Sequence, residues 1–221
     1  MFFTLVAINT HRIKTYLIYM KKVICSIAVL LTACFSVFAS GPKKGLDTAT
    51  FATGCFWCTE AKFQQLKGVE KVISGFSGGH VANPSYELVC TGTTGHAEAC
   101  NIIYDPTKIT YDELIAAFFV AHDPTQLNRQ GNDVGTQYRS AIFYHNAQQK
   151  QKAQYYITKL NAEKAYKDPI VTQVVPYKNF YKAEDYHQNY FNQNGSQPYC
   201  KYVIQPELEK FKKVFKDKLK Q

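Results

Sequence analysis

The segment Gly54-Cys55-Phe56-Trp57-Cys58 combines two thiols with two aromatic rings, and it lies between a predicted strand and a predicted helix. The thiolate form of cysteine is the nucleophile, and the N-terminus of a helix is one of the backbone features that favour it near neutral pH. We therefore predict that Cys55 is a reactive thiol. Phe56 and Trp57 would then supply apolar walls for a substrate group beside its sulfur.

The spacing of Cys55 and Cys58 fits three kinds of site: a thioredoxin-like dithiol, half of a zinc site, or a nucleophile with a resolving thiol. Zinc would require a second closely spaced pair of ligands. Cys90 and Cys100 are too far apart in sequence to form such a pair, and they fall on either side of a strand start. We therefore expect no metal and regard Cys90 and Cys100 as structural thiols.

Three further segments place glycines and polar side chains near strand ends, where functional sites are often built: 75–86, 92–98 and 130–140. Glu98 lies at the start of the apolar strand predicted over 97–104. If its side chain points inward, burial favours the protonated acid, which could then donate a proton at neutral pH. The sequence alone leaves the orientation of Glu98 open.

The N-terminal residues 1–39 are typical of an export signal. Met20, the expected true start, precedes two lysines and an apolar run, and residues 37–39 resemble a cleavage site. Lipidation of Cys34 followed by membrane anchoring is the alternative. We expect an exported protein with a linker over 40–47 and a catalytic domain over 48–221.

Seven cysteines divide unevenly between these regions, because Cys25 and Cys34 belong to the leader and five belong to the domain. An odd number leaves at least one thiol unpaired or in exchange. In an oxidising exported setting, this count favours redox chemistry over a purely structural set of disulfides.

The formal net charge of +9 raises the possibility of nucleic-acid binding, but the charge is concentrated at the two ends. The first forty residues carry four positive charges, and residues 201–221 carry a net of four more. The body of the domain is therefore nearly neutral. We interpret the C-terminal lysines as the solvated face of an amphipathic helix and expect no nucleic-acid partner.

Hydrophobic periodicity predicts the order strand, helix, strand, strand, helix, strand, followed by additional elements. Thr110 and Glu113 have the spacing of a capping box, which marks a helix start. This order is that of an α+β fold: a two-layer ferredoxin-like split β-α-β sandwich with a C-terminal extension. The predicted strands are 48–53, 69–76, 97–104, 140–144 and 170–175, and the predicted helices are 59–66, 110–121, 147–164 and 206–219.

Five segments in this order closely resemble the peptide methionine sulfoxide reductase A family, and the resemblance covers residues 48–216. The segments are 54–60, 92–98, 130–140, Ala183-Glu184-Asp185-Tyr186-His187-Gln188 and Pro198-Tyr199-Cys200. The resemblance implies thiol-dependent reduction of methionine S-sulfoxide, free or in proteins. It implies no cofactor, and recycling by an external dithiol of the thioredoxin type. We expect the protein to be a monomer.

The resemblance also implies roles for the first motif. Cys55 matches the family's catalytic cysteine, which attacks the sulfoxide sulfur, while Phe56 and Trp57 match the residues that hold the substrate methyl group. Attack leaves Cys55 as a sulfenic acid, and a second thiol condenses with it to form a disulfide.

Four further residues match the groups that act on the sulfoxide oxygen. Glu98 corresponds to the acid that protonates this oxygen, and Tyr86 and Tyr138 correspond to hydroxyls that hydrogen-bond to it. Asp133 corresponds to an acidic residue that supports the site.

The family pattern allows two candidates for the thiol that resolves the sulfenic acid, Cys58 and Cys200. Cys200 follows a segment rich in Gly and Asn, from which we expect it to reach Cys55 by loop motion. We therefore expect Cys200 to resolve first and Cys58 to relay the disulfide. Two other functions remain open: a thioredoxin-like disulfide oxidoreductase, and a basic surface-binding module that acts through the C-terminal lysines.

Overall fold

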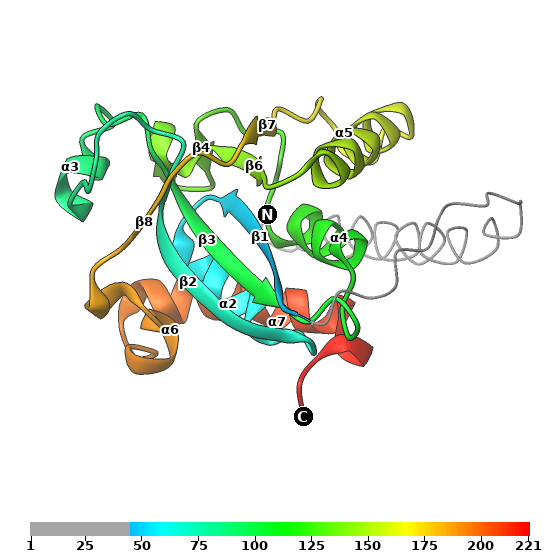
Figure 1. Cartoon of the computed structure of the whole chain (residues 1–221). Coiled ribbons are helices and arrows are strands. Elements are labelled where there is room, and N and C mark those ends of the chain that lie inside the picture. Colours follow the sequence, from blue (N-terminus) through cyan, green and yellow to red (C-terminus); the bar gives the residue numbers. More distant parts are fainter. Residues whose placement is uncertain (1–44) are drawn as a thin grey trace, which may run out of the picture. The chain divides into compact units, whose positions relative to one another are not determined.

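The computed structural model describes residues 45–221 (Figure 1). The predicted leader, with Met20 and Cys34, lies outside these residues, as does most of the predicted linker. Within 45–221, no helix is both long enough and apolar enough to cross a membrane.

A six-stranded mixed sheet forms the centre of the domain, with the strand order β7-β6-β1-β3-β2-β8. Its four central strands are β6 (Ser140–Tyr144), β1 (Asp47–Thr53), β3 (Ala97–Tyr104) and β2 (Val69–Ser77), and they pair antiparallel with one another. Strands β1 and β2 therefore flank β3, which is the split β-α-β arrangement. The predicted α+β ferredoxin-like fold is confirmed.

Two short strands extend this sheet at its edges. β7 (Gln173–Pro176) pairs in parallel with β6, and β8 (Phe180–Lys182) pairs antiparallel with the end of β2. Only β7 was expected, and it begins later than predicted. Strand β8 brings the chain to the β2 edge, from which the C-terminal segment returns to helix α2 (Figure 1).

The main core lies between one face of the sheet and the helices α2 (Phe56–Phe63), α4 (Tyr111–Ala121) and α7 (Gln205–Val214). Alternation along β1 directs Phe51 into this core, where its ring packs against Phe63 and Phe118. The start of α4 is fixed by the predicted capping box: Glu113 N–H donates to the Thr110 hydroxyl, and Glu113 accepts from Thr110 N–H.

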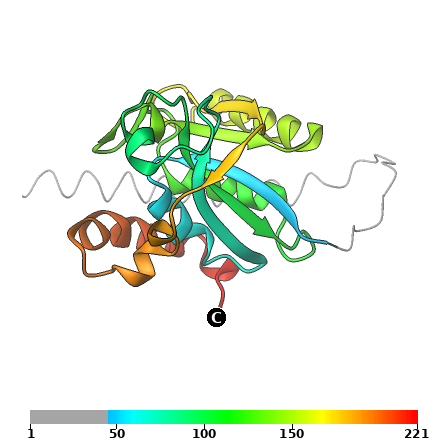
Figure 2. The ribbon, with the colours of Figure 1, turned by 60° about the vertical axis from the view of Figure 1, so that its left-hand side comes forward.

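The remaining helices lie toward the sheet edges. Helix α5 (Ala147–Ala162) contacts β6 and β7, and the C-terminal segment gathers beside α2, as the orange and red ribbon of Figure 2 shows. The second face of the sheet carries small side chains with one large ring. These residues are Ala52, Ala97, Ala99, Ala141 and Phe143.

The boundaries and several short elements differ from the predictions. Helix α2 spans 56–63 instead of 59–66. The predicted C-terminal helix 206–219 is divided into α7 and a 3-10 turn (Lys216–Lys218), and a π-helical turn (Cys200–Ile204) precedes it. Segments 126–137 and 189–198 are rich in Gly, Asn and Gln, which predicts loops, but the first contains a ribbon of β4 (Arg129–Gln130) with β5 (Asp133–Val134) and the second contains helix α6 (Tyr190–Gln193). Helix α3 (Tyr86–Cys90) was not predicted. Such short elements depend on tertiary contacts and leave little periodicity in the sequence.

Candidate active site

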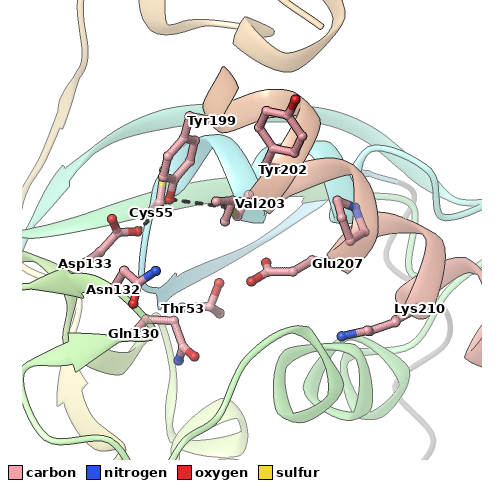
Figure 3. A pocket seen from close by; sticks show the side chains of 13 residues that line it. Thr53, Cys55, Gln130, Asn132, Asp133, Tyr199, Tyr202, Val203, Glu207 and Lys210 are labelled. Atoms are coloured by element: carbon pink, nitrogen blue, oxygen red, sulfur yellow. Dashed lines mark hydrogen bonds between the residues drawn. The ribbon is translucent and has the colours of Figure 1, made fainter. Parts of the chain in front are cut away.

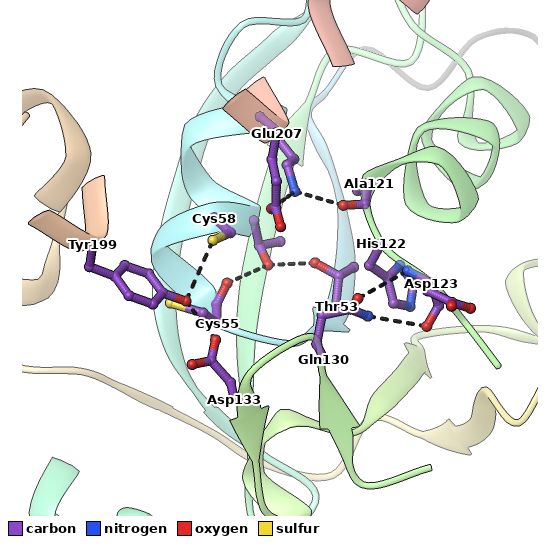
Figure 4. Close-up of polar contacts among 12 residues, drawn as sticks. Thr53, Cys55, Cys58, Ala121, His122, Asp123, Gln130, Asp133, Tyr199 and Glu207 are labelled. Atoms are coloured by element: carbon purple, nitrogen blue, oxygen red, sulfur yellow. Dashed lines mark hydrogen bonds and ion pairs between the residues drawn. The ribbon is translucent and has the colours of Figure 1, made fainter. Parts of the chain in front are cut away.

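Cys55 occupies the N-cap position between β1 and α2. Gly54 makes this junction possible, because its φ of +95° is left-handed and a Cβ there would lie 2.6 Å from the Cβ of Gln130. The Cys55 carbonyl accepts hydrogen bonds from the backbone N–H and the hydroxyl of Thr59, at 3.2 and 3.1 Å. The Thr59 hydroxyl in turn meets that of Thr53 at 2.6 Å, so both elements hold the turn that presents the thiol (Figure 4).

Burial sets the protonation state of this thiol. The side chain of Cys55 is 6% exposed, and desolvation, followed by the neighbouring Cys58 and Glu98, raises its pKa well above the usual value. At rest, Cys55 is therefore a protonated thiol. Cys55 lies at the start of the helix, as expected, and a helix N-terminus favours the thiolate. Burial of the sulfur disfavours the thiolate, and this effect is the larger one.

Glu98 points inward from β3 and is 1% exposed. One carboxyl oxygen accepts the backbone N–H of Phe56 at 2.9 Å, which places this acid beside the first residue of α2. Burial raises the pKa of Glu98 to about 8, with a further contribution from the charge of Asp133. Glu98 is therefore mainly a neutral carboxylic acid at pH 7, as its proposed use as a proton donor requires.

A cavity of about 180 Å³ lies over these two groups, on the side that faces α3 and the loop before β6. It contains all seven residues that the sequence linked to sulfoxide chemistry and one that it did not. The lining consists of Cys55, Phe56, Trp57, Tyr86, Glu98, Asp133, Tyr138 and Tyr199.

Two phenols enter the cavity from short elements. Tyr86 is the first residue of α3, whose N-cap Ser85 accepts from Leu88 N–H, and Tyr138 ends the 3-10 turn Thr136–Tyr138. Burial, followed by the charge of Glu98, raises the pKa of both phenols. Both hydroxyls therefore stay protonated and can donate hydrogen bonds to an oxygen bound in the cavity.

The apolar wall is an aromatic stack. Phe56 is 1% exposed, and its ring lies 6.2 Å from that of Tyr86 at an interplanar angle of 24°. Trp57 stacks on Tyr190 at 3.8 Å and 7°, while its indole N–H donates to Nδ1 of His187 at 3.1 Å. The rings form a rigid surface suited to a small apolar group.

Tyr199 is the lining residue that the sequence analysis missed. Its hydroxyl donates to Oδ2 of Asp133 at 2.5 Å and lies 4.0 Å from Sγ of Cys58 (Figure 4). The only signal in the sequence was its place directly before Cys200 in the segment 198–200. Burial raises the pKa of Tyr199 strongly, so it remains a hydrogen-bond donor.

Three thiols gather behind this residue. Cys55, Cys58 and Cys200 belong to one buried cluster with Ala61 and Ile204, and none of the three forms a disulfide. The neighbouring Cys58 raises the pKa of both Cys55 and Cys200, after the larger effect of burial, so Cys58 is close to both.

The environments of two cysteines correct the sequence analysis. Cys200 does not lie in a mobile loop: it is fully buried and begins the π-helical turn that leads into α7. Cys90 is exposed at the end of α3, which does not fit a structural thiol, whereas Cys100 is fully buried and its thiol donates to the Phe56 carbonyl at 3.6 Å.

A second cavity, of about 300 Å³, is lined by Cys55, Cys58 and Tyr199 (Figure 3). It shares Cys55, Asp133 and Tyr199 with the first cavity, but Cys58 lines only this one. Its far end is polar, with Glu207 and Lys210 on α7. Cys55 therefore lines two cavities, and only the larger one also reaches Cys58.

The arrangement suits two-electron sulfur chemistry with proton transfer. Within residues 45–221, no group of three or more His, Cys, Asp or Glu side chains is placed to hold a metal ion. The chemical groups at the site are thiols, one protonated carboxylic acid and phenols.

Known proteins share this sequence and architecture. The family model for peptide methionine sulfoxide reductase matches residues 47–219. Among curated relatives, the peptide methionine sulfoxide reductase MsrA of Haloquadratum walsbyi is 54% identical over 173 residues, covering 78% of this chain and 98% of that protein. The MsrA of Deinococcus radiodurans is 52% identical over 179 residues, covering 81% and 87%.

Solved structures lead to the same family. Reduced Mxr1 from Saccharomyces cerevisiae superposes with a TM-score of 0.66 at 35% identity, over 71% of this chain and 90% of that one. The methionine sulfoxide reductase A of Corynebacterium diphtheriae has a TM-score of 0.62 at 41% identity, over 69% and 76%. This chain therefore belongs to the peptide methionine sulfoxide reductase family, in its MsrA branch.

Proposed function

We infer that the protein reduces methionine S-sulfoxide, free or within oxidised proteins, to methionine at the cavity above Cys55. The observation that carries this function is the meeting of a thiol nucleophile with a carboxylic acid that is still protonated at pH 7. Cleavage of an S–O bond needs both: a nucleophile on sulfur and a proton on the departing oxygen.

The first step consumes one thiol and produces one sulfenic acid. As Glu98 gives its proton to the sulfoxide oxygen, the substrate sulfur becomes positively charged, which favours loss of the proton from Cys55. The Cys55 sulfur attacks the substrate sulfur, and the S–O bond breaks with loss of the oxygen as water, which carries the protons of Glu98 and Cys55. Water then attacks the Cys55 sulfur of the S–S-bonded sulfonium, the S–S bond breaks to release methionine, Cys55 is left as S–OH, and a proton returns to Glu98. The net change converts sulfoxide and thiol to methionine and sulfenic acid.

We assign functions to the other residues that line the cavity from where they lie in it. Tyr86 and Tyr138 donate hydrogen bonds to the sulfoxide oxygen, while Phe56 and Trp57 enclose the methyl group on sulfur. Burial raises the pKa of Glu98 most, and the charge of Asp133 adds to this effect, which favours the protonated acid.

Cys58 is the favoured first resolving thiol. Residues three apart at the start of a helix have neighbouring side chains, which is within the reach of a disulfide. Condensation of the Cys58 thiol with the Cys55 sulfenic acid forms the disulfide and releases water. Cys200 then exchanges with this disulfide, which frees Cys55. This order reverses the one expected from sequence, because Cys200 is packed beside Cys58 and not carried by a mobile loop.

An external dithiol of the thioredoxin type completes the cycle. It reduces the Cys58–Cys200 disulfide by thiol exchange and takes up the two oxidising equivalents that came from the sulfoxide. The second cavity supports this step, because it gives access to Cys58 without entry into the substrate cavity.

The decisive experiment measures methionine release from purified S- and R-sulfoxides with dithiothreitol as reductant, for the wild type and Cys55→Ser. We expect turnover of the S epimer by the wild type alone. Unchanged activity in Cys55→Ser would falsify the assignment of the nucleophile. Reduction of insulin disulfides in the absence of sulfoxide turnover would instead indicate a disulfide oxidoreductase.

We also propose that the protein is exported, on the sequence pattern of residues 1–39 alone. Sequencing the N-terminus of the mature protein distinguishes cleavage after Ala39 from lipidation of Cys34. A mature protein that retains residues 20–39 contradicts both.

A further inference from the structure

A short segment between β8 and α6, residues 184–190, packs against the aromatic wall of the substrate cavity. We call it the brace segment. It overlaps the sequence motif 183–188, which the proposed chemistry leaves without a role. Its side chains contact three elements that are far apart in sequence: β2, α2 and α3.

His187, in the 3-10 turn of this segment, is 1% exposed and makes the central contact. Its Nδ1 accepts the indole N–H of Trp57 at 3.1 Å. An indole nitrogen can only donate, so Nδ1 carries no proton and the ring proton lies on Nε2. The contact therefore requires a neutral imidazole in a single tautomer.

Glu184 lies on the other side of the imidazole. Its Oε2 is 3.8 Å from Nε2 of His187, so the carboxylate faces the nitrogen that carries the proton. Its Oε1 accepts the backbone N–H of Tyr86 at 2.9 Å. The rings of His187 and Tyr86 are 4.3 Å apart. Glu184 and His187 thus connect two walls of the cavity, Trp57 on α2 and Tyr86 on α3.

The rest of the brace segment is fixed in place. The side-chain amide of Gln188 accepts from Ser74 N–H at 3.1 Å and donates to the Ser74 carbonyl at 2.9 Å, as a paired strand would. Asn189 has a left-handed φ of +54°, and its N–H donates to the buried carboxylate of Glu60 at 2.8 Å. Tyr190 can therefore lie flat on Trp57.

We propose that His187 is a positioning residue that holds Trp57 in the orientation needed to grip the substrate methyl group, with Glu184 orienting the imidazole. The proposal rests on the proposed function of the cavity, because that function has Trp57 contacting the methyl group of the substrate. Without the acceptor, the indole N–H has no partner at this partly buried site, and the ring gains other rotamers. A side chain that must hold substrate to within a fraction of an ångström depends on such support.

A matched pair of substitutions isolates the hydrogen bond from the packing. In His187→Asn, the amide oxygen can accept near the position of Nδ1, whereas His187→Leu has nearly the same size and offers no acceptor. Trp57 is the only tryptophan of the chain, so tryptophan fluorescence reports on this ring alone. Both variants are first compared by thermal unfolding.

For His187→Leu we expect KM for methionine sulfoxide to rise about tenfold while kcat changes by less than about threefold, because Trp57 contacts the methyl group in the ground state and the transition state alike. Acrylamide quenching of Trp57 should increase. In His187→Asn, both KM and quenching should return most of the way to wild type. Equal behaviour of the two variants in both measurements overturns the proposal.

A titration of the wild type gives a second test that does not need the leucine variant to fold. Protonation of Nδ1 must break the bond to Trp57, and burial lowers the pKa of His187, so Trp57 emission should change on acidification below the usual histidine range. Glu184 and Glu87 act electrostatically on the imidazole, and Tyr86 and Tyr186 pack on it. His187→Asn controls for titration of the two carboxylates.

The transition should be present in the wild type and absent in His187→Asn. The same transition in both proteins contradicts the proposal. Fluorescence is independent of turnover, so its result stands even if the wild type shows no sulfoxide reductase activity, which would refute the proposed function and not the Trp57–His187 contact.

Discussion

The hydroxyl of Tyr199 donates to Asp133 at 2.5 Å, and both residues line the substrate cavity and the cavity that reaches Cys58. This hydrogen bond therefore joins two side chains that each line both cavities. Tyr199 directly precedes Cys200, and Asp133 influences the acid Glu98, so this pair links the resolving side of the site to the substrate side.

Asp133→Asn should change the pH dependence of the reaction. The negative charge of Asp133 raises the pKa of Glu98, so its removal lowers that pKa. Glu98 then loses its proton at a lower pH, and the alkaline fall in kcat/KM should move from about pH 8 toward neutrality. Single-turnover rates between pH 6 and 9 measure the shift. A fall that stays in place or moves to higher pH contradicts the coupling.

Tyr199→Phe should raise the pKa of Asp133 and lower the stability of the domain. The tyrosine hydrogen bond lowers the pKa of Asp133, so its loss raises that pKa and destabilises the charged form. A hydrogen bond to a charged group at a half-buried site contributes about 1.5 to 3 kcal/mol, so we expect a loss of stability near the lower end at pH 7. Urea unfolding measures it. The double variant Tyr199→Phe with Asp133→Asn is the control and should lose less than the two single losses combined.

Glu98→Gln keeps the shape of the side chain and removes the transferable proton. The wild-type kcat/KM should fall as pH rises through about 8, because the acid form of Glu98 is then lost. The glutamine variant should lose on the order of 10² to 10⁴ in the single-turnover rate and show no such limb. Retention of the alkaline limb in Glu98→Gln would assign that pKa to another group.

Serine variants of the two candidate resolving thiols should behave differently in one turnover without reductant. Cys200→Ser should still form the Cys55–Cys58 disulfide at the wild-type rate, because Cys58 is close to Cys55 and close to Cys200. Cys58→Ser should accumulate sulfenic acid that dimedone can trap. Mass spectrometry identifies each product. The reverse pattern restores Cys200 as the first resolving thiol.

His122 should make the domain sensitive to acid. Its half-buried imidazole donates from Nδ1 to the Phe118 carbonyl at 2.9 Å and accepts at Nε2 from the Ser140 hydroxyl at 2.7 Å. Burial lowers the pKa of His122 to about 3, so the unfolded chain binds this proton more readily and stability falls as pH drops from about 6.5 toward 3.

The size of this effect can be isolated by His122→Gln. Between pH 7 and pH 5, the histidine should contribute a loss of about 2 kcal/mol in the free energy of unfolding, at 1.36 kcal/mol per pH unit below 6.5. Urea unfolding at both pH values gives the difference. Parallel losses in the wild type and the variant would show that other groups cause the acid sensitivity.

Much of the fold was predictable because it depends on local patterns. The alternation in β1, the capping box at Thr110 and Glu113, and the order of strands and helices each follow from the types of neighbouring residues. The sequence could not predict whether the Glu98 side chain points into the core, because the start of a strand does not show which of its faces is buried. Short elements such as α3 and β8 were missed because their stability comes from distant partners, as in the pairing of β8 with β2.

The sequence by itself determined the family, the candidate nucleophile and the set of groups that could serve it, because these depend on residue types and their order in segments. Only the tertiary structure decided how those groups behave. It buried Cys55 and raised its pKa, placed Cys58 close to both Cys55 and Cys200, and added Tyr199 and His187 to the site. Desolvation depends on packing, as do hydrogen bonds between residues 66 positions apart (Tyr199 and Asp133) and 130 positions apart (Trp57 and His187). The spacing of residues along the chain does not record this packing.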